Sequence, residues 1–380
     1  MEFEKIVCPI CDGDSGKTVY EKDHAVLFGN ELRPCSLVQV ICCDCGLIYT
    51  NPQPTTASLN EFYDQYFMYG ELGDDPLRGR QLSFLLDHVQ PAGKTLFDIG
   101  AHNGTFMNLA AGAGFEVMGI EPSARARQEA ESRFGMKLLP GFFTESNIGS
   151  AVNDYDVVVL NHVLEHVKNP LEVLRLAGEI TAEGGSVFVE VPDMENPQTD
   201  NMADFFTPEH TVYFTTGTLA MAASKVGLVL EHLERDEQKH AFRVLLRKAE
   251  CQEVSREKRR EECMRSQGIM EEYSARKRLF HQEIKERLRG ISGTIIVYGA
   301  GLHTAQLFRS GVLEGLNVEA VVDSNPQRWG SMFDGFEVLP PQILAGGEFT
   351  VVISSHESQN QIADYLAEQF PKSRAVKLYT

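Results

Sequence analysis

Five of the eight cysteines lie in two short clusters near the start of the chain. Each cluster contains a Cys-x-x-Cys pair, and about thirty residues separate the two pairs. Two such pairs supply the four thiolates that a tetrahedral zinc ion requires. Four protein ligands close the coordination sphere, so we expect this metal to stabilise the fold and not to catalyse. Disulfides or unpaired thiols are the alternative, and Cys35 and Cys43 compete for the fourth position. The predicted ligands are Cys8, Cys11, Cys42 and Cys45.

A second candidate site lies in the stretch FDIGAHNGTFM, where a glycine-rich turn follows an apolar run. Gly100 and Gly104 let a ligand approach the backbone closely, and the helix expected next offers N–H donors at its start. Glu121 ends the following apolar run, where it can accept hydrogen bonds from ribose hydroxyls. The pattern predicts a site for a nucleoside-containing cofactor. A nucleotide-type fold that has lost its cofactor is the alternative.

The third candidate is the stretch FFTPEHTVYFT, which follows the apolar run SVFVEVP and carries Glu209, His210 and Tyr213. Its position predicts that it lies at the carboxyl edge of a sheet, where doubly wound folds bind ligands. A histidine can remove a proton near neutral pH, so we place general-base chemistry at His210 and a hydrogen bond to substrate at Tyr213. The alternative is that His210 caps the helix that follows and Tyr213 belongs to the core.

Another glycine-rich turn, VYGAGLHTAQLF, is followed by VVDSNP, which places an acid at Asp323. This arrangement resembles a dinucleotide-binding unit, but the third glycine is missing and Asp323 leads directly into a turn. The sequence favours substrate binding or a scaffolding role for this part of the chain. A second cofactor, of the nicotinamide class, is the alternative.

Composition sets broad limits on the function. The chain has 380 residues, of which 43% are hydrophobic and 23% charged, as expected for a globular protein of two or three domains. The net charge of −19 opposes binding to nucleic acid. No stretch has the length and apolar character of a membrane span, and no secretion signal is recognisable, so we expect a cytoplasmic protein without a membrane partner.

The elements that must position these residues follow an alternating pattern. From KTLFDIG to GGSVFVEVP, apolar runs alternate with helical spacing, which predicts an α/β fold with a parallel sheet. A charged segment then predicts one or two solvated helices that Gly268 interrupts. The expected domains are a zinc module and connector (1–70), a central α/β core (71–248), a helical linker (249–290) and a smaller C-terminal lobe (291–380).

Together, DIGAHNGTF with its following acid and LNHVLEHV after an apolar run resemble a class I S-adenosylmethionine-dependent methyltransferase. The resemblance extends to a three-part family with a zinc module, a methyltransferase core and a C-terminal Rossmann-like lobe, as in bacterial sugar C-methyltransferases. It rests on the paired Cys-x-x-Cys motifs, CGLIYTNP, FFTPEHTVYFT and the VYGAG and VDSNPQRWG pair.

The resemblance implies roles for individual residues. The turn holds the methionine and ribose parts of S-adenosylmethionine, and Glu121 binds the ribose. Glu209 and His210 remove a proton from the acceptor, with His166 assisting. His102 and His162 have the alternative role of orienting the fold. The implied cofactor-binding residues are Asp98, Gly100, Ala101, His102, Gly104, Glu121, Asn161 and His162.

These expectations combine into one leading function. The protein is expected to transfer a methyl group from S-adenosylmethionine to a carbon or a hydroxyl of a nucleotide-linked sugar. In the family, the C-terminal lobe closes over this acceptor and holds no cofactor. The family's usual Lys-Gly is replaced here by His303-Thr304, which leaves the identity of the acceptor open. The alternatives are a nicotinamide-dependent oxidoreductase that uses the C-terminal lobe and a non-catalytic adaptor that contains zinc. The oligomeric state stays open.

Overall fold

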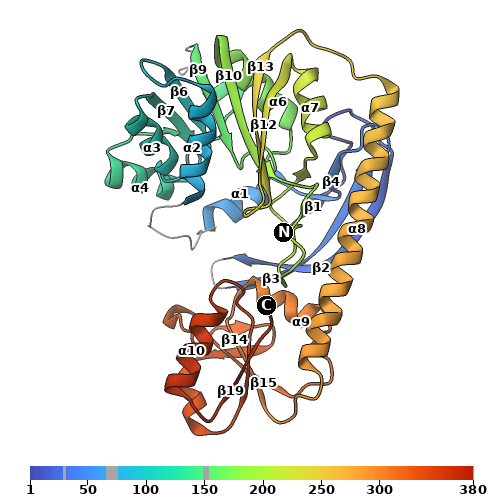
Figure 1. The fold of residues 1–380 in the computed structure, drawn as a ribbon, viewed down its shortest axis with the longest axis vertical. Helices are drawn as coiled ribbons and strands as arrows, with labels where there is room; N and C mark the ends of the chain where they lie inside the picture. The colour runs from blue at the N-terminus through green and yellow to red at the C-terminus, as the bar shows by residue number, and fades with distance from the viewer. Residues whose placement is uncertain (29–30, 66–75, 149–153, 380) are drawn as a thin grey trace.

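The computed structural model describes residues 1–28, 31–65, 76–148 and 154–379 (Figure 1). The boundary expected at residue 70 lies outside these residues. A central α/β unit lies at one end of the molecule and a smaller α/β unit at the other, and a long helix runs along one side of both (Figure 1).

The central sheet has the strand order β12-β13-β10-β9-β6-β7-β8. The strands from β6 to β10 pair in parallel, whereas β13 pairs antiparallel with both β10 and β12. The chain moves from β6 to one side and then returns to β9 on the other, so the carboxyl ends of β6 and β9 form the switch point where ligands bind in such sheets. The strands are β6 (Thr95–Ile99), β7 (Glu116–Glu121), β8 (Leu139–Pro140), β9 (Tyr155–Asn161), β10 (Thr181–Pro192), β12 (Leu228–Asp236) and β13 (Ala241–Lys248).

Helices cover both faces of this sheet because its inner strands are apolar on both sides. Val157 packs with Phe84 of α2 and Phe106 of α3 on one face, while the next residue, Val158, packs with Leu174 of α6 and other side chains on the opposite face. This two-sided burial is typical of parallel sheets. The helices are α2 (Pro76–His88), α3 (Thr105–Ala113), α4 (Ala124–Phe134), α5 (Glu145–Ile148), α6 (Pro170–Ile180) and α7 (Thr216–Lys225).

The N-terminal segment forms a sheet of order β11-β4-β3-β2, with a separate pair of β1 and β5. Its strand β11 comes from FFTPEHTVYFT, far along the chain, and pairs with β4. The sheet therefore joins the cysteine-containing segment to the stretch that carries His210. The elements are β1 (Phe3–Glu4), β2 (Gly16–Phe28), β3 (Glu31–Cys42), β4 (Ile48–Thr50), β5 (Gln53–Pro54), α1 (Thr56–Gln65) and β11 (Val212–Tyr213).

The charged segment forms one helix, α8 (Arg256–Leu288), which continues through Gly268, so the expected break at this glycine is wrong. The expectation of a fully solvated helix is also wrong, because a stripe of α8 that includes Met270, Tyr273 and Ile284 is buried against the rest of the protein. Packing of this stripe offsets the cost of a helical glycine, about 1 kcal/mol. Among the described residues, no helix combines the length and apolarity needed to cross a membrane.

The C-terminal residues form a second sheet of order β16-β17-β15-β14-β18-β19, parallel except for β16 against β17. The β2–β3 hairpin reaches it, since Ala25 is buried with Val297 and Leu307. The elements are β14 (Ile295–Tyr298), α9 (Leu302–Arg309), β15 (Val318–Val322), η1 (Pro326–Arg328), β16 (Met332–Phe333), β17 (Phe336–Leu339), η2 (Pro341–Gly346), β18 (Thr350–Ile353), α10 (Gln359–Gln369) and β19 (Arg374–Lys377).

Candidate active site and metal centre

A pocket opens at the switch point between β6 and β9. The Oδ1 atom of Asp98 and both polar side-chain atoms of Asn161 are buried there without a hydrogen-bond partner among the described residues. Burial raises the pKa of Asp98 to about 7, Arg78 opposes this rise and Glu121 adds to it. Unpaired buried polar atoms are costly, which indicates that a polar ligand completes them. The pocket is lined by Arg78, Asp98, Gly100, Ala101, His102, Asn103, Thr105, Phe106 and Asn161.

The glycine-rich turn has the conformation that its sequence predicted. Gly100 and Gly104 have φ angles of 72° and 75°, in the left-handed region that favours glycine. A Cβ atom on Gly100 would lie 2.9 Å from a methyl group of Val163, and one on Gly104 would lie 3.1 Å from the Cβ of Ala130. The turn therefore needs glycine at both positions, although Gly104 itself does not line the pocket.

Glu121 lies beside the turn and is fixed by two backbone donors. The N–H of His102 donates to its Oε2 at 2.9 Å, and the N–H of Ser123 donates to its Oε1 at 2.8 Å. Each carboxylate oxygen keeps a further lone pair for another donor. This geometry suits a carboxylate that binds a diol, as expected for a ribose.

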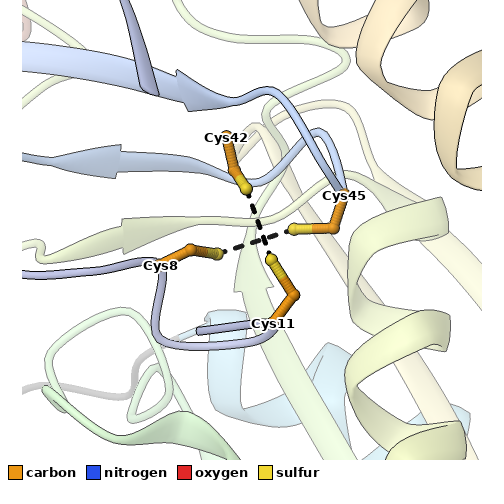
Figure 2. A group of neighbouring side chains, drawn as sticks. All are labelled: Cys8, Cys11, Cys42 and Cys45. Carbon is orange, nitrogen blue, oxygen red and sulfur yellow. Dashed lines mark hydrogen bonds between the residues drawn. The ribbon is translucent and has the colours of Figure 1, made fainter. Parts of the chain in front are cut away.

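The four predicted zinc ligands converge in space (Figure 2). Their sulfur atoms lie 3.5 Å apart for Cys8 and Cys45 and 3.4 Å apart for Cys11 and Cys42. Zinc–sulfur bonds of about 2.3 Å in a tetrahedron require sulfurs about 3.8 Å apart, whereas a disulfide requires about 2 Å. The donor set and its spacing therefore fit zinc and do not fit disulfides. Cys35 and Cys43 lie outside the cluster.

A second cluster gathers beside the pocket from two loops. Ligand atoms of Glu165, His166 and His210 all lie within 4.8 Å of one another. The rings of His166 and His210 meet edge to face with centroids 4.6 Å apart, and the hydroxyl of Tyr63 lies 2.9 Å from Nδ1 of His166. Glu165 and His166 follow Asn161 closely in sequence, which connects this cluster to the cofactor pocket.

The environment of this cluster favours a neutral His210. Burial lowers the pKa of His210 to about 3, with His166 adding to the effect and Glu165 opposing it. Burial also raises the pKa of Glu209, while the charge of His166 acts to lower it. The Nδ1 atom of His210 is buried and has no partner among the described residues, so its lone pair is available in the tautomer that carries the proton on Nε2.

The N-terminal sheet holds His210 in place. Thr50 donates a hydrogen bond from its hydroxyl to the carbonyl oxygen of His210 at 3.0 Å, and Gln53 donates to the carbonyl of Thr211. The N–H of Thr211 donates in turn to the carbonyl of Glu165 at 2.7 Å. The cysteine-containing module and the loop after β9 thus fix the histidine from two sides.

His162 points toward two buried carboxylates. Its Nδ1 lies 3.0 Å from Glu165 and its Nε2 lies 3.0 Å from Glu190. Burial acts to lower the pKa of His162, but its hydrogen bonds to these two residues raise that pKa to about 9. Burial likewise acts to raise the pKa of Glu165, but His162 lowers it to about 2. Both ring nitrogens of His162 are thus used inside the fold, which favours the alternative role of orienting the fold over cofactor binding.

The Glu190 carboxylate extends the network into the core. It accepts hydrogen bonds from Gln81 and from the fully buried Arg243, whose guanidinium also pairs with Asp236 and Glu234. A buried charge is tolerated only when its partners are in place. This network therefore fixes the strand ends on which His162 and Glu165 depend.

Two expectations for FFTPEHTVYFT need correction. Tyr213 does not face an open site, because its buried hydroxyl donates to the carbonyl of Thr207 and accepts from the N–H of the same residue. The suggested capping role of His210 is also wrong, since the side chain of Thr215 caps α7 by accepting from the N–H of Thr218.

The C-terminal glycine turn is closed by its own residues. The N–H of Ala300 donates to Oδ2 of Asp323 at 2.7 Å, and the N–H of Asn325 donates to Oδ1 at 2.8 Å. Arg328 donates to the carbonyl of Ala300. Asp323 thus stabilises its turn with the same pair of backbone contacts as Glu121, and these contacts alone do not distinguish the two turns.

Comparison with known proteins identifies the class of the central unit. Residues 71–233 match the methyltransferase domain family. These residues form a class I S-adenosylmethionine-dependent methyltransferase domain. The match contains both the pocket and the Glu165–His166–His210 cluster.

Individual relatives include both carbon and oxygen methyltransferases. The chain is 26% identical over 273 residues to C-methyltransferase NovU of Streptomyces niveus, covering 67% of this chain and 64% of NovU. It is 29% identical over 118 residues to ubiquinone biosynthesis O-methyltransferase of Nitrosospira multiformis, covering 30% of this chain and 48% of the relative. The chain thus spans less than two thirds of either relative.

The chain is also similar in part to solved structures of methyltransferases. CcbJ methyltransferase from Streptomyces caelestis is 16% identical, with a TM-score of 0.40, and the alignment covers 48% of this chain and all of CcbJ.

Several residues of the site had no distinct signal in the sequence. Glu165 was visible only as a neighbour of His166, and Arg243 lies in a strand that reads as apolar. Tyr63 is separated from His166 by about a hundred residues. The residues that only the structure brings to the site are Tyr63, Arg78, Gln81, Asn103, Thr105, Phe106, Glu165, Glu190 and Arg243.

Proposed function

We propose that this protein transfers a methyl group from S-adenosylmethionine to a sugar acceptor that is linked to a nucleotide. The observation that carries the proposal is the pocket at the ends of β6 and β9 with its unpaired Asp98 and Asn161 atoms. The loop that follows β9 also supplies Glu165 and His166 to the base cluster. The likeness to a C-methyltransferase and an O-methyltransferase supports the reaction class but leaves carbon and oxygen as possible acceptor atoms.

The cofactor supplies an electrophilic methyl group on a sulfonium. Asp98 and Asn161 offer polar atoms to its methionine part, and the Glu121 carboxylate offers acceptors to its ribose hydroxyls. The glycine turn lets the backbone approach the ligand, with Ala101 and His102 in the pocket wall. The residues therefore account for binding and orientation of the donor.

His210 serves as the general base. Its free Nδ1 takes a proton from the acceptor, and the resulting imidazolium is stabilised by the carboxylate of Glu165. His166 and Glu209 complete the polar wall, and Tyr63 holds the ring of His166. The low pKa of His210 keeps its imidazole unprotonated at neutral pH. The same low pKa makes this histidine a weak base until the acceptor is bound.

Zinc has a structural role in the proposal. The cluster of Cys8, Cys11, Cys42 and Cys45 binds one zinc ion, and the strand that follows it contacts the backbone at His210 through Thr50. The metal thereby stabilises the support of the base without touching the substrate.

The C-terminal sheet contributes to acceptor binding. His303 and His356 lie at its carboxyl edge, with ring centroids 6.3 Å apart. Burial, with His356 and Lys277 adding to the effect, lowers the pKa of His303 to about 4, so this side chain offers a neutral imidazole for hydrogen bonds to an acceptor. The missing third glycine of the C-terminal turn argues against a nicotinamide cofactor there.

The test is a methylation assay on nucleotide-linked sugars with and without a ketone. The expected product is heavier by one methylene unit, with S-adenosylhomocysteine and a proton released. Carbon methylation exchanges the hydrogen beside the ketone with deuterium from solvent before transfer, whereas hydroxyl methylation leaves that position unlabelled. Absence of methylated product across both classes, together with demonstrated cofactor binding, contradicts the sugar acceptor.

A further inference from the structure

The cluster beside the cofactor pocket has the composition of a metal site as well as that of a base. Glu165 and His166 come from the loop after β9, and His210 comes from the segment before β11. Their ligand atoms lie within 4.8 Å of one another, so small side-chain movements bring three donors onto one ion. Bond lengths of about 2.0–2.2 Å to imidazole nitrogen and carboxylate oxygen are typical of zinc.

The cluster also has unused coordinating atoms. Glu165 is 1% exposed, and its Oε2 has no hydrogen-bond partner among the described residues. The Nδ1 atom of His210 is in the same state. Buried carboxylate and imidazole atoms are normally paired, and these two belong to residues whose ligand atoms converge.

The surroundings resemble the outer shell of a metal centre. The hydroxyl of Tyr63 contacts Nδ1 of His166 and fixes the orientation of the ring, which leaves Nε2 to coordinate. His162 contacts the other oxygen of Glu165 and fixes that carboxylate. Two nitrogens and one oxygen favour zinc and related transition metals over magnesium or calcium, which prefer oxygen ligands.

We propose that Glu165, His166 and His210 bind a divalent transition metal ion such as Zn²⁺, at a site separate from the four-cysteine cluster. Metal binding by these residues does not depend on the acceptor of the methyl group. One consequence rests on the proposed function: an ion on His210 occupies the lone pair that the base needs, so zinc inhibits methyl transfer.

The experiment measures zinc per chain after equilibrium dialysis of the full-length protein against micromolar free Zn²⁺. Wild type is expected to hold two equivalents, one at the cysteines and one at the new site. The variants His210→Ala and His166→Gln are each expected to hold one equivalent of zinc. Their affinity for the second ion should fall by more than roughly 10–100-fold, which is the cost of losing a partner that only contacts a metal ligand. Melting temperatures establish that each variant is folded, and either variant alone is sufficient for the test.

His232→Ala is the matched control. The rings of His88 and His232 stack 3.9 Å apart outside the cluster, so this pair tests for adventitious zinc on other imidazoles. This control keeps two equivalents if the proposal is right. Wild type with a single equivalent overturns it, as does a second equivalent that survives in His210→Ala or disappears in His232→Ala.

Turnover at increasing Zn²⁺ separates this proposal from the proposed function. A second equivalent accompanied by inhibition supports both. A second equivalent with unchanged turnover supports the metal site and contradicts His210 as the base.

Discussion

The four-cysteine cluster and the Glu165–His166–His210 cluster both bring metal-binding side chains together, yet their surroundings differ. Each cysteine sulfur lies near another sulfur, in a group whose members come from two short turns. The second cluster mixes a carboxylate with imidazoles and keeps buried atoms without partners among the described residues. Four thiolates suffice to close the coordination sphere of one zinc ion, whereas the second cluster has atoms left for a proton or an ion.

This difference indicates which cluster stabilises and which reacts. A closed set of four thiolates holds its metal away from substrate. A partly unsatisfied set is costly to the fold and is retained where it does chemistry. Thr50 connects the two by following the cysteine module and contacting the backbone of His210. The comparison predicts that mutations in the first cluster affect folding and that mutations in the second affect turnover.

The largest effect is expected for Cys42→Ser. Loss of a thiolate ligand should release the zinc and lower the free energy of unfolding by several kcal/mol, because structural zinc contributes about 10–16 kcal/mol in peptides. Metal analysis and urea unfolding measure both quantities. Cys43→Ser, at the exposed neighbouring position, is the control and should keep both zinc and stability. A Cys42→Ser protein that retains zinc would remove the distinction between the clusters.

His210→Asn should show the opposite pattern. We expect turnover to fall by roughly two to four orders of magnitude, the range for a general base, while cofactor affinity and melting temperature change little. Turnover, calorimetry and melting are measured on one preparation. His232→Asn, whose ring stacks on His88 outside the pocket and the cluster, is the control and should keep its turnover. If His210→Asn is fully active, then either His166 is the general base or the reaction does not need a general base from the protein.

His162 makes the second cluster sensitive to alkaline pH. Its pKa is raised from about 6.5 in the unfolded chain to about 9 in the folded protein. The stabilisation is therefore complete below about pH 6.5 and is lost as the pH rises through about 9, by an amount on the order of 1–3 kcal/mol. Comparing urea unfolding of wild type and His162→Gln at pH 6.5 and 9.5 isolates this contribution. Equal pH dependence in the two proteins contradicts it.

Asp98 should make cofactor binding depend on pH near neutrality. Burial holds its pKa at about 7, and the positively charged cofactor prefers the ionised carboxylate. Affinity for S-adenosylmethionine should therefore rise about tenfold between pH 6 and 8, following the ionised fraction of the group. Asp98→Asn should bind more weakly and lose this dependence in calorimetric titrations. A flat wild-type profile would mean that Asp98 does not contact the charged part of the ligand.

The smallest effect is expected at the cap of α7. Thr215→Ala should cost on the order of 1–2 kcal/mol of stability, because the N–H of Thr218 loses its acceptor and Glu262 loses the hydroxyl that donates to it, with turnover per folded molecule unchanged. Thr215→Ser keeps the oxygen and should recover the loss. A fall in turnover comparable to that of His210→Asn would show that the helix start, and not the histidine, governs the reaction.

The sequence was informative where ligands lie close together along the chain. The Cys-x-x-Cys spacing identified all four members of the first cluster, and the glycine turn with Glu121 identified the methyltransferase core. Local spacing fixes these geometries because a single turn places the donors. The same reasoning failed at Gly268, where burial of one face of α8 outweighs the local preference of glycine.

Tertiary structure decided the second cluster. The position of His210 in its motif could suggest a base. The sequence could not place Tyr63 against His166 or Thr50 against the backbone of His210, since these contacts join segments about 100 to 160 residues apart. It also could not distinguish Tyr213, whose hydroxyl is used inside the fold, from a substrate-binding tyrosine. The sequence by itself determined the residue types and the α/β order of the core. Only packing determined which polar atoms found partners and which were left for a ligand, because hydrogen-bond satisfaction depends on neighbours that the chain brings together when it folds.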